Sequence, residues 1–527
     1  MDIKKALSEI STEDQSPLVK KLIDIISECN EIIEKQAQEI SYLKDEIARM
    51  KGGNIRPHIK PSILEKESRP NNSNKRKTKR KKKRLKINQE YKLHPEDIPE
   101  GSKFKGYRDY FIQDITIKPN VIRYRRGVWI TPEGKRIIAS LPGGINGHYG
   151  TGLKQYILHL NYDLNVPQNM ILESLNELGI QISAGELHKI LTEDHDVFHS
   201  EKDQLLDIGL KIFPFLSVDD TGARHKGRNG YCTHIGNDFF SYFKSTESKS
   251  RINFLKILRG NRTDYTFTSE SFEYMHMYGL VQPKYNRLKG AMERIIADEN
   301  EWKSFLRMIG IRGEKETRII TEAALLGSIL YHGINRDIVI VSDEAGQFEI
   351  TLHHALCWLH AERKLSVLIP INDYQRKIIE DISNDIWNLY SKLKAYKKAP
   401  DEKKKSLLEK QFDDILTQET EFKNINKALQ LIFKNKKELL LVLDRPEIPL
   451  HNNMSENPIR SFVTKRKIHG GTRSETGRRC RDTFISLKKT CRKLGISFRE
   501  YLFDRLSGNN NIPSLSNLMK EMAFPET

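Results

Sequence analysis

A run of positive charge from Lys75 to Lys86 divides this chain into two parts that must fold separately. Ten of these twelve residues are lysine or arginine. Such a segment carries too little apolar surface to form a packed core, so compact structure must lie before it or after it. We expect residues 51–95 to form a solvated basic linker, in which Lys79, Arg80 and Lys81 bind phosphates without sequence preference.

The charge of the whole chain points to a polyanionic partner. Its 527 residues include 88 Lys and Arg against 70 Asp and Glu, which gives a formal net charge of +18. Basic side chains that neutralise phosphates release counterions whatever the base sequence, so nucleic acid is the first candidate. A ribosome-binding or membrane-surface protein can carry the same charge, so composition does not identify a reaction.

The cysteines and the hydropathy pattern bear on the cellular compartment. Five cysteines are scattered along the chain without a C-x-x-C pair, a pattern typical of a reducing compartment. The first residues lack the apolar core of a signal peptide, and no run of about 18 apolar residues occurs. We therefore expect a cytoplasmic protein that does not interact with a membrane.

The N-terminal segment has the spacing of a coiled coil. From Val19 to Met50, mostly apolar residues recur at alternating steps of three and four, with the polar Gln36 on the same seam. This pattern predicts a coiled coil within residues 1–50 and a homo-oligomer built on it. The alternative is that the apolar stripe packs on a globular domain of its own chain.

Residues 96–200 combine strand-like and helical patterns. The segments FIQDITI, VIRYRRGVWI and KRIIASL alternate apolar and polar residues, which predicts a small antiparallel sheet. A leucine-rich stretch then ends at Gly179, and Ser183-x-x-Glu186 resembles a capping box that opens a second helix. The spacing is that of a DNA-binding helix-turn-helix, although any αα-hairpin can share it.

Four acidic residues lie at positions that chemistry could use. An apolar run ends in Asp219 and Asp220, and the continuous apolar run before Asp343 is typical of a strand buried on both faces. Residues 365–445 return to helical periodicity. Glu456 follows them within a strongly basic segment, where Asn453-x-x-Glu456 could instead be a helix capping box.

Four sequence motifs occur in the order seen in one family of enzymes. They are the segment from KFKGYRDYF to NGHYG, SVDDTGAR, VSDEAGQF with CWLHAERKL, and HNNMSENPIRSFVTKRK. In these motifs the chain resembles transposases of the insertion sequence 66 family over most of residues 95–500. The resemblance implies an α/β RNase H-like core in two parts, 205–364 and 446–505, interrupted by a helical insertion at 365–445. A C-terminal tail would occupy residues 506–527.

The same resemblance implies which residues are catalytic. Asp219, Asp343 and Glu456 match the three acids of a DDE site, which would hold two Mg²⁺ or Mn²⁺ ions. Two such ions can activate the attacking oxygen and stabilise the leaving oxygen at a phosphodiester, and they prefer oxygen ligands. Successive residues of a strand point to opposite faces, so only one of Asp219 and Asp220 can serve, and the resemblance favours Asp219.

The implied function is that of a bacterial insertion-sequence transposase in the cytoplasm, associated with the nucleoid. It would bind terminal inverted repeats, cleave the element ends and join them to target DNA, with accessory proteins of the same element as further partners. Arg460, Lys465, Arg466 and Lys467 would bind the DNA backbone, although a solvated basic face is the alternative. Other interpretations are an inactive DNA-binding derivative or an RNase H-like nuclease without strand transfer.

The positions of the cysteines bear on whether the chain binds zinc. Cys357-x-x-His360 has half of a zinc-site spacing without an obvious complementary pair, so we expect structural packing there. Relatives often carry a cysteine-rich zinc segment after the coiled coil, whereas this chain has the basic run and no cysteine at that place. We therefore expect no zinc in that segment.

Overall fold

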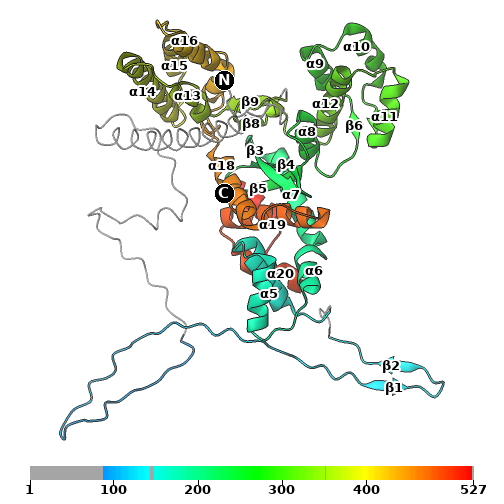
Figure 1. Cartoon of the computed structure of the whole chain (residues 1–527), viewed down its shortest axis with the longest axis vertical. Coiled ribbons are helices and arrows are strands. Elements are labelled where there is room, and N and C mark those ends of the chain that lie inside the picture. Colours follow the sequence, from blue (N-terminus) through cyan, green and yellow to red (C-terminus); the bar gives the residue numbers. More distant parts are fainter. Residues whose placement is uncertain (1–86, 143–146, 351, 525–527) are drawn as a thin grey trace, which may run out of the picture. The chain divides into compact units, whose positions relative to one another are not determined.

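The structure is a computed structural model that describes residues 87–142, 147–350 and 352–524 (Figure 1). The predicted coiled coil and most of the basic linker, including Lys79, Arg80 and Lys81, lie outside these residues. The described chain forms two units. The smaller unit contains residues 87–141 and 173–182, and the larger contains nearly all the remaining residues.

The smaller unit contains a single β-hairpin among its described residues. Strands β1 (Val128–Ile130) and β2 (Arg136–Ile138) pair antiparallel, as expected for the two later segments of the predicted sheet. The segment FIQDITI forms no strand, so the prediction of a sheet that includes it was wrong. Its apolar side chains are exposed, and an alternating pattern forms a stable strand only where one face can be buried.

The larger unit is built on a mixed five-stranded sheet. Its strands lie in the order β5-β4-β3-β8-β9. Antiparallel pairing joins β3 to β4 and β4 to β5, whereas β3, β8 and β9 run parallel. The bounds are β3 (Phe215–His225), β4 (Arg228–Gly236), β5 (Ser241–Thr246), β8 (Val339–Ser342) and β9 (His353–Leu356). The apolar run that predicted a fully buried strand is β8, and all four of its residues are buried.

Two helices cover one face of the antiparallel half of the sheet. Ile459 and Phe462 of α18 (Asn453–His469) and Ile485 of α19 (Glu475–Lys493) form one apolar cluster with Ala223, Cys232 and Phe243 of the three strands. Asp482 of α19 reinforces this contact, because its carboxylate accepts hydrogen bonds from the backbone N and the Oγ of Ser245 at 2.7 and 2.9 Å. Helix α18 is thereby fixed over β3.

A helical lobe separates β5 from β8. It contains α8 (Arg251–Arg259), α9 (Ser269–Met277), α10 (Gln282–Leu288), α11 (Glu299–Met308), α12 (Glu314–Tyr331) and a short β6–β7 pair (Tyr265–Thr266 and Ile295–Ile296). A separate helical lobe was not predicted within residues 205–364. The lobe was missed because α12 is buried on most sides, so its apolar residues do not recur with a clear helical period.

A second helical region follows β9 (Figure 1). It comprises α13 (Trp358–Ser366), α14 (Asp373–Tyr396), α15 (Glu402–Leu416), α16 (Lys423–Phe433) and α17 (Lys436–Leu440). These helices share one apolar core, in which the predicted face of α14 is buried. Helical structure was thus correctly predicted for residues 365–445, and it begins slightly earlier, with α13.

The termini of the larger unit pack against each other. Helices α4 (Thr151–Leu158), α6 (Ala184–Thr192) and α7 (Asp196–Ile212) precede the sheet, and α20 (Phe498–Ser507) and α21 (Leu515–Ala523) follow α19. Helix α5 (Gln168–Glu177) has residues in both units. The hydroxyl of Ser183 caps α6 by accepting from the backbone N of Glu186, which is one half of the predicted capping box, whereas the Glu186 carboxylate accepts from Lys189. Residues 506–527 were expected to be a tail, which is wrong, because Leu515 and Met519 of α21 are fully buried.

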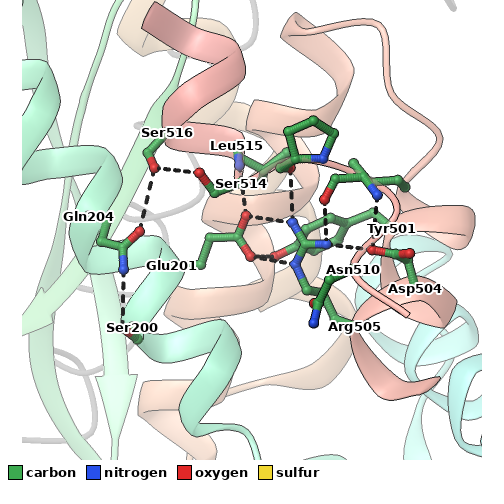
Figure 2. A network of polar contacts seen from close by, with 12 residues as sticks. Ser200, Glu201, Gln204, Tyr501, Asp504, Arg505, Asn510, Ser514, Leu515 and Ser516 are labelled. Carbon is green, nitrogen blue, oxygen red and sulfur yellow. Dashed lines mark hydrogen bonds and ion pairs between the residues drawn. The ribbon is translucent and has the colours of Figure 1, made fainter. Parts of the chain in front are cut away.

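A buried ionic network fixes this C-terminal structure (Figure 2). Arg505 of α20 donates to both carboxylate oxygens of Glu201 of α7, at 2.9 and 3.1 Å. Glu201 also accepts from the Tyr501 hydroxyl at 2.8 Å and from the backbone N of Leu515 at 2.7 Å. One carboxylate thus holds α7, α20 and the start of α21 together.

Replacing Glu201 is expected to destabilise this region strongly. Glu201→Gln removes one of the two buried carboxylates that pair with the Arg505 guanidinium, the other being that of Asp504, and breaking a buried ion pair costs about 3–5 kcal/mol. Chemical denaturation measures the loss. The control is Glu186→Gln, which breaks an exposed pair with Lys189 and should cost less than about 1 kcal/mol. Equal losses from the two substitutions would contradict this account.

Candidate active site

The parallel pairing of β3 with β8 brings two of the predicted acids to the same level. Ser217 is paired with Val341, and Asp219 and Asp343 each lie two residues further along. Level residues on neighbouring strands point to the same face, and residues two apart share a face. Asp219 and Asp343 therefore lie side by side at one face of the sheet, with Asp343 in the loop directly after β8.

The covered face distinguishes Asp219 from Asp220. Asp219 shares its face with Ala223, which packs on α18. Asp220 points to the opposite face, where its Oδ2 accepts a hydrogen bond from Gln347 at 2.9 Å. The geometry therefore favours Asp219 over Asp220 as the partner of a group on α18.

Glu456 lies in the first turn of α18, the helix that packs on the face of the sheet shared by Asp219 and Ala223. The helix begins at Asn453, and the residue before it, Asn452, makes no capping hydrogen bond with its side chain. The alternative of an Asn453–Glu456 capping box was therefore wrong, because Asn453 is already inside the helix. Glu456 is left to interact with other groups.

Two hydrogen bonds outside the predicted set fix the start of α18 over β3. His234 is opposite Asp219 on β4, and its Nδ1 shares a hydrogen bond with the Ser455 hydroxyl at 2.9 Å. Asn452 donates from its side chain to the backbone O of Val218 at 2.7 Å. Neither residue was predicted, because a lone histidine and an asparagine carry no signal in the sequence before their partners are known. Together they hold Glu456 near Asp219.

The charges of Asp343 and Glu456 both act on Asp219. Burial raises the pKa of Asp219 to about 7, and the charges of Asp343 and Glu456 raise it further against a hydrogen bond from the backbone N of Asp220. Burial also raises the pKa of Asp220, which hydrogen bonds from Thr233 and Gln347 oppose. A set of carboxylates that repel each other in this way would be stabilised by a cation.

The donor set fits a hard divalent ion. Asp219, Asp343 and Glu456 offer only carboxylate oxygens, which Mg²⁺ and Mn²⁺ prefer. The guanidinium of Arg460 lies 4.0 Å from the carboxylate of Glu456, and the Arg460 side chain is 65% exposed. The carboxylates thus retain lone pairs for metal coordination.

The four basic residues of α18 lie in different environments. Arg460 and Lys467 are exposed, and Arg466 donates to the backbone O of Gly222 on β3. Lys465 is only 5% exposed, and its ammonium donates to the backbone O of Asn161 at 2.6 Å. Its assignment to a DNA-binding surface is therefore corrected, because its charge is already used inside the protein.

Cys357 and His360 lie beside Glu456. Cys357 precedes α13 and is buried, as expected for structural packing, and burial raises the pKa of its thiol to about 11. His360 is one turn further along, and its Nδ1 is 3.9 Å from Glu456 Oε1. The packing interpretation of this motif therefore omitted its proximity to the third acid.

Comparison with known proteins places this arrangement in a family. The model of the Transposase IS66 family matches residues 326–479. The uncharacterized protein y4jO of Sinorhizobium fredii is 42% identical over 304 residues, which are 57% of this chain and 94% of that protein. The chain belongs to the IS66 transposase family. The matched residues include Asp343 and Glu456, whereas Asp219 precedes them.

Membership of this family identifies a transposase-type protein that processes DNA. None of the helices in the described ranges combines the length and the apolar character needed to cross a bilayer.

The raised pKa of Asp219 predicts how stability depends on pH in the metal-free protein. The folded state holds the proton of the Asp219 carboxyl more tightly than the unfolded state does. The contribution of this proton to the free energy of unfolding is therefore fully present below pH 3.8 and is lost as pH rises through about 7. Asp219→Asn should therefore stabilise the metal-free protein by about 1–3 kcal/mol at pH 8 and by much less at pH 4.5. Denaturant unfolding at the two pH values measures the difference.

The control for this prediction is Glu344→Gln. Glu344 is next to Asp343, but it is exposed and paired with Lys364, which lowers its pKa despite partial burial. This substitution should give no gain at pH 8. A gain from Asp219→Asn that is the same at both pH values would show that the carboxylate charge is not its cause.

Proposed function

We propose that this chain is a DDE transposase in which Asp219, Asp343 and Glu456 hold two Mg²⁺ or Mn²⁺ ions against a DNA phosphate. The observation that carries the proposal is the convergence of three carboxylates from β3, the loop after β8 and the first turn of α18. The charges of Asp343 and Glu456 both act on Asp219, although long stretches of chain separate the three residues.

The proposed reaction has two steps at phosphorus. A water oxygen attacks the phosphodiester at the element end, the bond to the 3′ oxygen breaks, and that oxygen leaves as a 3′-hydroxyl with a proton. The oxygen of this hydroxyl then attacks a phosphodiester of the target DNA and loses its proton, the target's bond from phosphorus to its 3′ oxygen breaks, and that oxygen leaves as a hydroxyl. One phosphodiester thus replaces another, and no nucleotide cofactor is required. Bound metal ions would activate the attacking oxygen and neutralise charge on the leaving oxygen.

The residues of this chain would orient the reaction. Asp219 and Asp343 come from neighbouring strands and supply a rigid pair, whereas Glu456 comes from α18. The buried hydrogen bonds of His234 and Asn452 would keep Glu456 at a fixed place relative to that pair. Rigid support of this kind favours a productive geometry at the phosphate.

The mixed sheet supports an RNase H-like assignment for the core. Three antiparallel strands continued by two parallel ones are compatible with that fold. Residues 205–364 and 446–505 would form the core, with 365–445 as an insertion. Within residues 96–200, helices α5 and α6 would read the inverted repeats, and the N-terminal segment would form the oligomer.

The DNA partners in this proposal are the element ends and the target. Arg460 and Lys467 would contact the phosphates beside the acids, and Arg466 would support them from its contact with β3. Accessory proteins of the same element would be further partners. The protein would act in the bacterial cytoplasm at the nucleoid.

Neutralising any of the three acids is expected to abolish cleavage. Asp219→Asn, Asp343→Asn or Glu456→Gln should each lower the rate of metal-dependent cleavage at labelled element ends by at least about 100-fold, because each removes a metal ligand. Binding of the ends in a gel-shift assay should persist. Normal cleavage by Asp343→Asn or Glu456→Gln would disprove the assignment.

Matched controls test the choice of acids. Glu344→Gln removes an exposed carboxylate beside Asp343 and should leave cleavage unchanged. Asp220→Asn should reduce cleavage less than Asp219→Asn, and the reverse order would make Asp220 the ligand. Transfer of labelled ends into a plasmid distinguishes a transposase from a nuclease that only cuts.

The basic residues of α18 should separate into two classes. Arg460→Ala and Lys467→Ala should weaken DNA binding, and each should reduce the slope of log affinity against log salt by about 1, because each removes a phosphate contact. Lys465→Ala should leave that slope unchanged and lower the unfolding free energy, since its ammonium is buried. An equal change of slope for all three would contradict this division.

A further inference from the structure

A sulfur, a nitrogen and an oxygen donor meet at the start of two helices. The Sγ of Cys357, a ring nitrogen of His360 and a carboxylate oxygen of Glu456 all lie within 4.8 Å of one another. Cys357 immediately precedes α13, His360 lies in its first turn, and Glu456 lies in the first turn of α18. The three donors therefore come from backbone that is fixed by helix starts.

Three buried polar atoms, one on His360 and two at the start of α18, lack partners. Within the described residues, the buried His360 Nδ1 makes no hydrogen bond, and neither do the side-chain oxygens of Asn452 and Asn453. Amide oxygens can only accept, so two of these atoms require a hydrogen-bond donor or a cation. Unpaired buried acceptors are costly, and they are expected where a cation or its bound water belongs.

The distance between His360 and Glu456 also points to a bridging ion. At 3.9 Å, Nδ1 and Oε1 are too far apart for a hydrogen bond. Two ligands of a tetrahedral Zn²⁺ ion, each at about 2.1 Å from the metal, are separated by about 3.5 Å. A small closure of the three side chains would therefore suffice for coordination.

The donor types differ from those of the three-acid site. Mg²⁺ and Mn²⁺ prefer oxygen ligands, whereas thiolate and imidazole select softer ions such as Zn²⁺. Glu456 is common to both groups of residues. Coordination of a metal by one group would therefore change what the other group can bind.

We propose that Cys357, His360 and Glu456 form a site for a thiophilic divalent cation of the Zn²⁺ class, and that its occupancy withdraws Glu456 from Asp219 and Asp343. The inhibitory part of this inference rests on the proposed function, whereas the binding site does not. On binding, a metal–sulfur bond replaces the S–H bond of Cys357, and the proton passes to solvent. A fourth coordination position would remain for water.

Binding is tested on the full metal-free chain with Co²⁺ as the probe. Coordination by a thiolate gives a charge-transfer absorption band, which we expect at one equivalent of Co²⁺ and which Zn²⁺ should displace. Cys357→Ser should eliminate the band, and His360→Gln should weaken binding by at least about 10-fold. No band in the wild-type chain, or an unchanged band in Cys357→Ser, would overturn the proposal.

The matched control is Cys480→Ser. Cys480 is also buried beside a histidine, with its Sγ 3.9 Å from His199 Nε2, but it does not belong to a three-donor group in the described chain. This variant should keep the band. His360→Gln changes a partly exposed side chain, so it tests the site even if Cys357→Ser fails to fold.

Activity assays separate this inference from the proposed function. Zn²⁺ should inhibit Mg²⁺-dependent end cleavage in the wild-type chain, and Cys357→Ser should resist that inhibition. Asp343→Asn should keep the Co²⁺ band while losing cleavage. A Cys357-dependent band in a chain that never cleaves DNA would leave the metal site standing and reject the proposed function. Cleavage without the band would do the opposite.

Discussion

The parallel pairing of β3 with β8 is the constraint on which the candidate site depends. It sets Asp219 level with Asp343, and the alternation of side chains then decides that Asp219 rather than Asp220 faces α18. A shift of β8 by one residue in this register would move Asp343 to the face opposite Asp219. The buried apolar residues of β8 therefore determine the position of the acids as well as the stability of the sheet.

The third acid depends on a different kind of interaction. Apolar packing of α18 on β3, β4 and β5 fixes the helix as a body, whereas hydrogen bonds from His234 and Asn452 fix its first turn. Two helical regions lie between the strands and this helix in the sequence. They can vary without moving Glu456, provided that these buried contacts are kept.

Glu456 connects the two groups of ligands that the structure brings together. On one side are two carboxylates from the sheet, and on the other are a thiol and an imidazole from the start of α13. The carboxylates of the first group favour hard cations, and the thiol and imidazole of the second group favour softer ones. A site that shares a ligand in this way can couple metal identity to activity without a large conformational change.

The family resemblance, rather than sequence spacing, predicted the three acids, whereas the sequence by itself determined the family and much of the secondary structure. Local patterns sufficed for these, because a motif, a buried strand such as β8 or the apolar face of α14 is written in neighbouring residues. The lobe from α8 to α12, the docked helix α21, the burial of Lys465 and the meeting of Cys357 and His360 with Glu456 were decided only by the tertiary structure. Each depends on contacts between residues far apart in the chain, and one sequence does not encode which distant surfaces will be buried against each other.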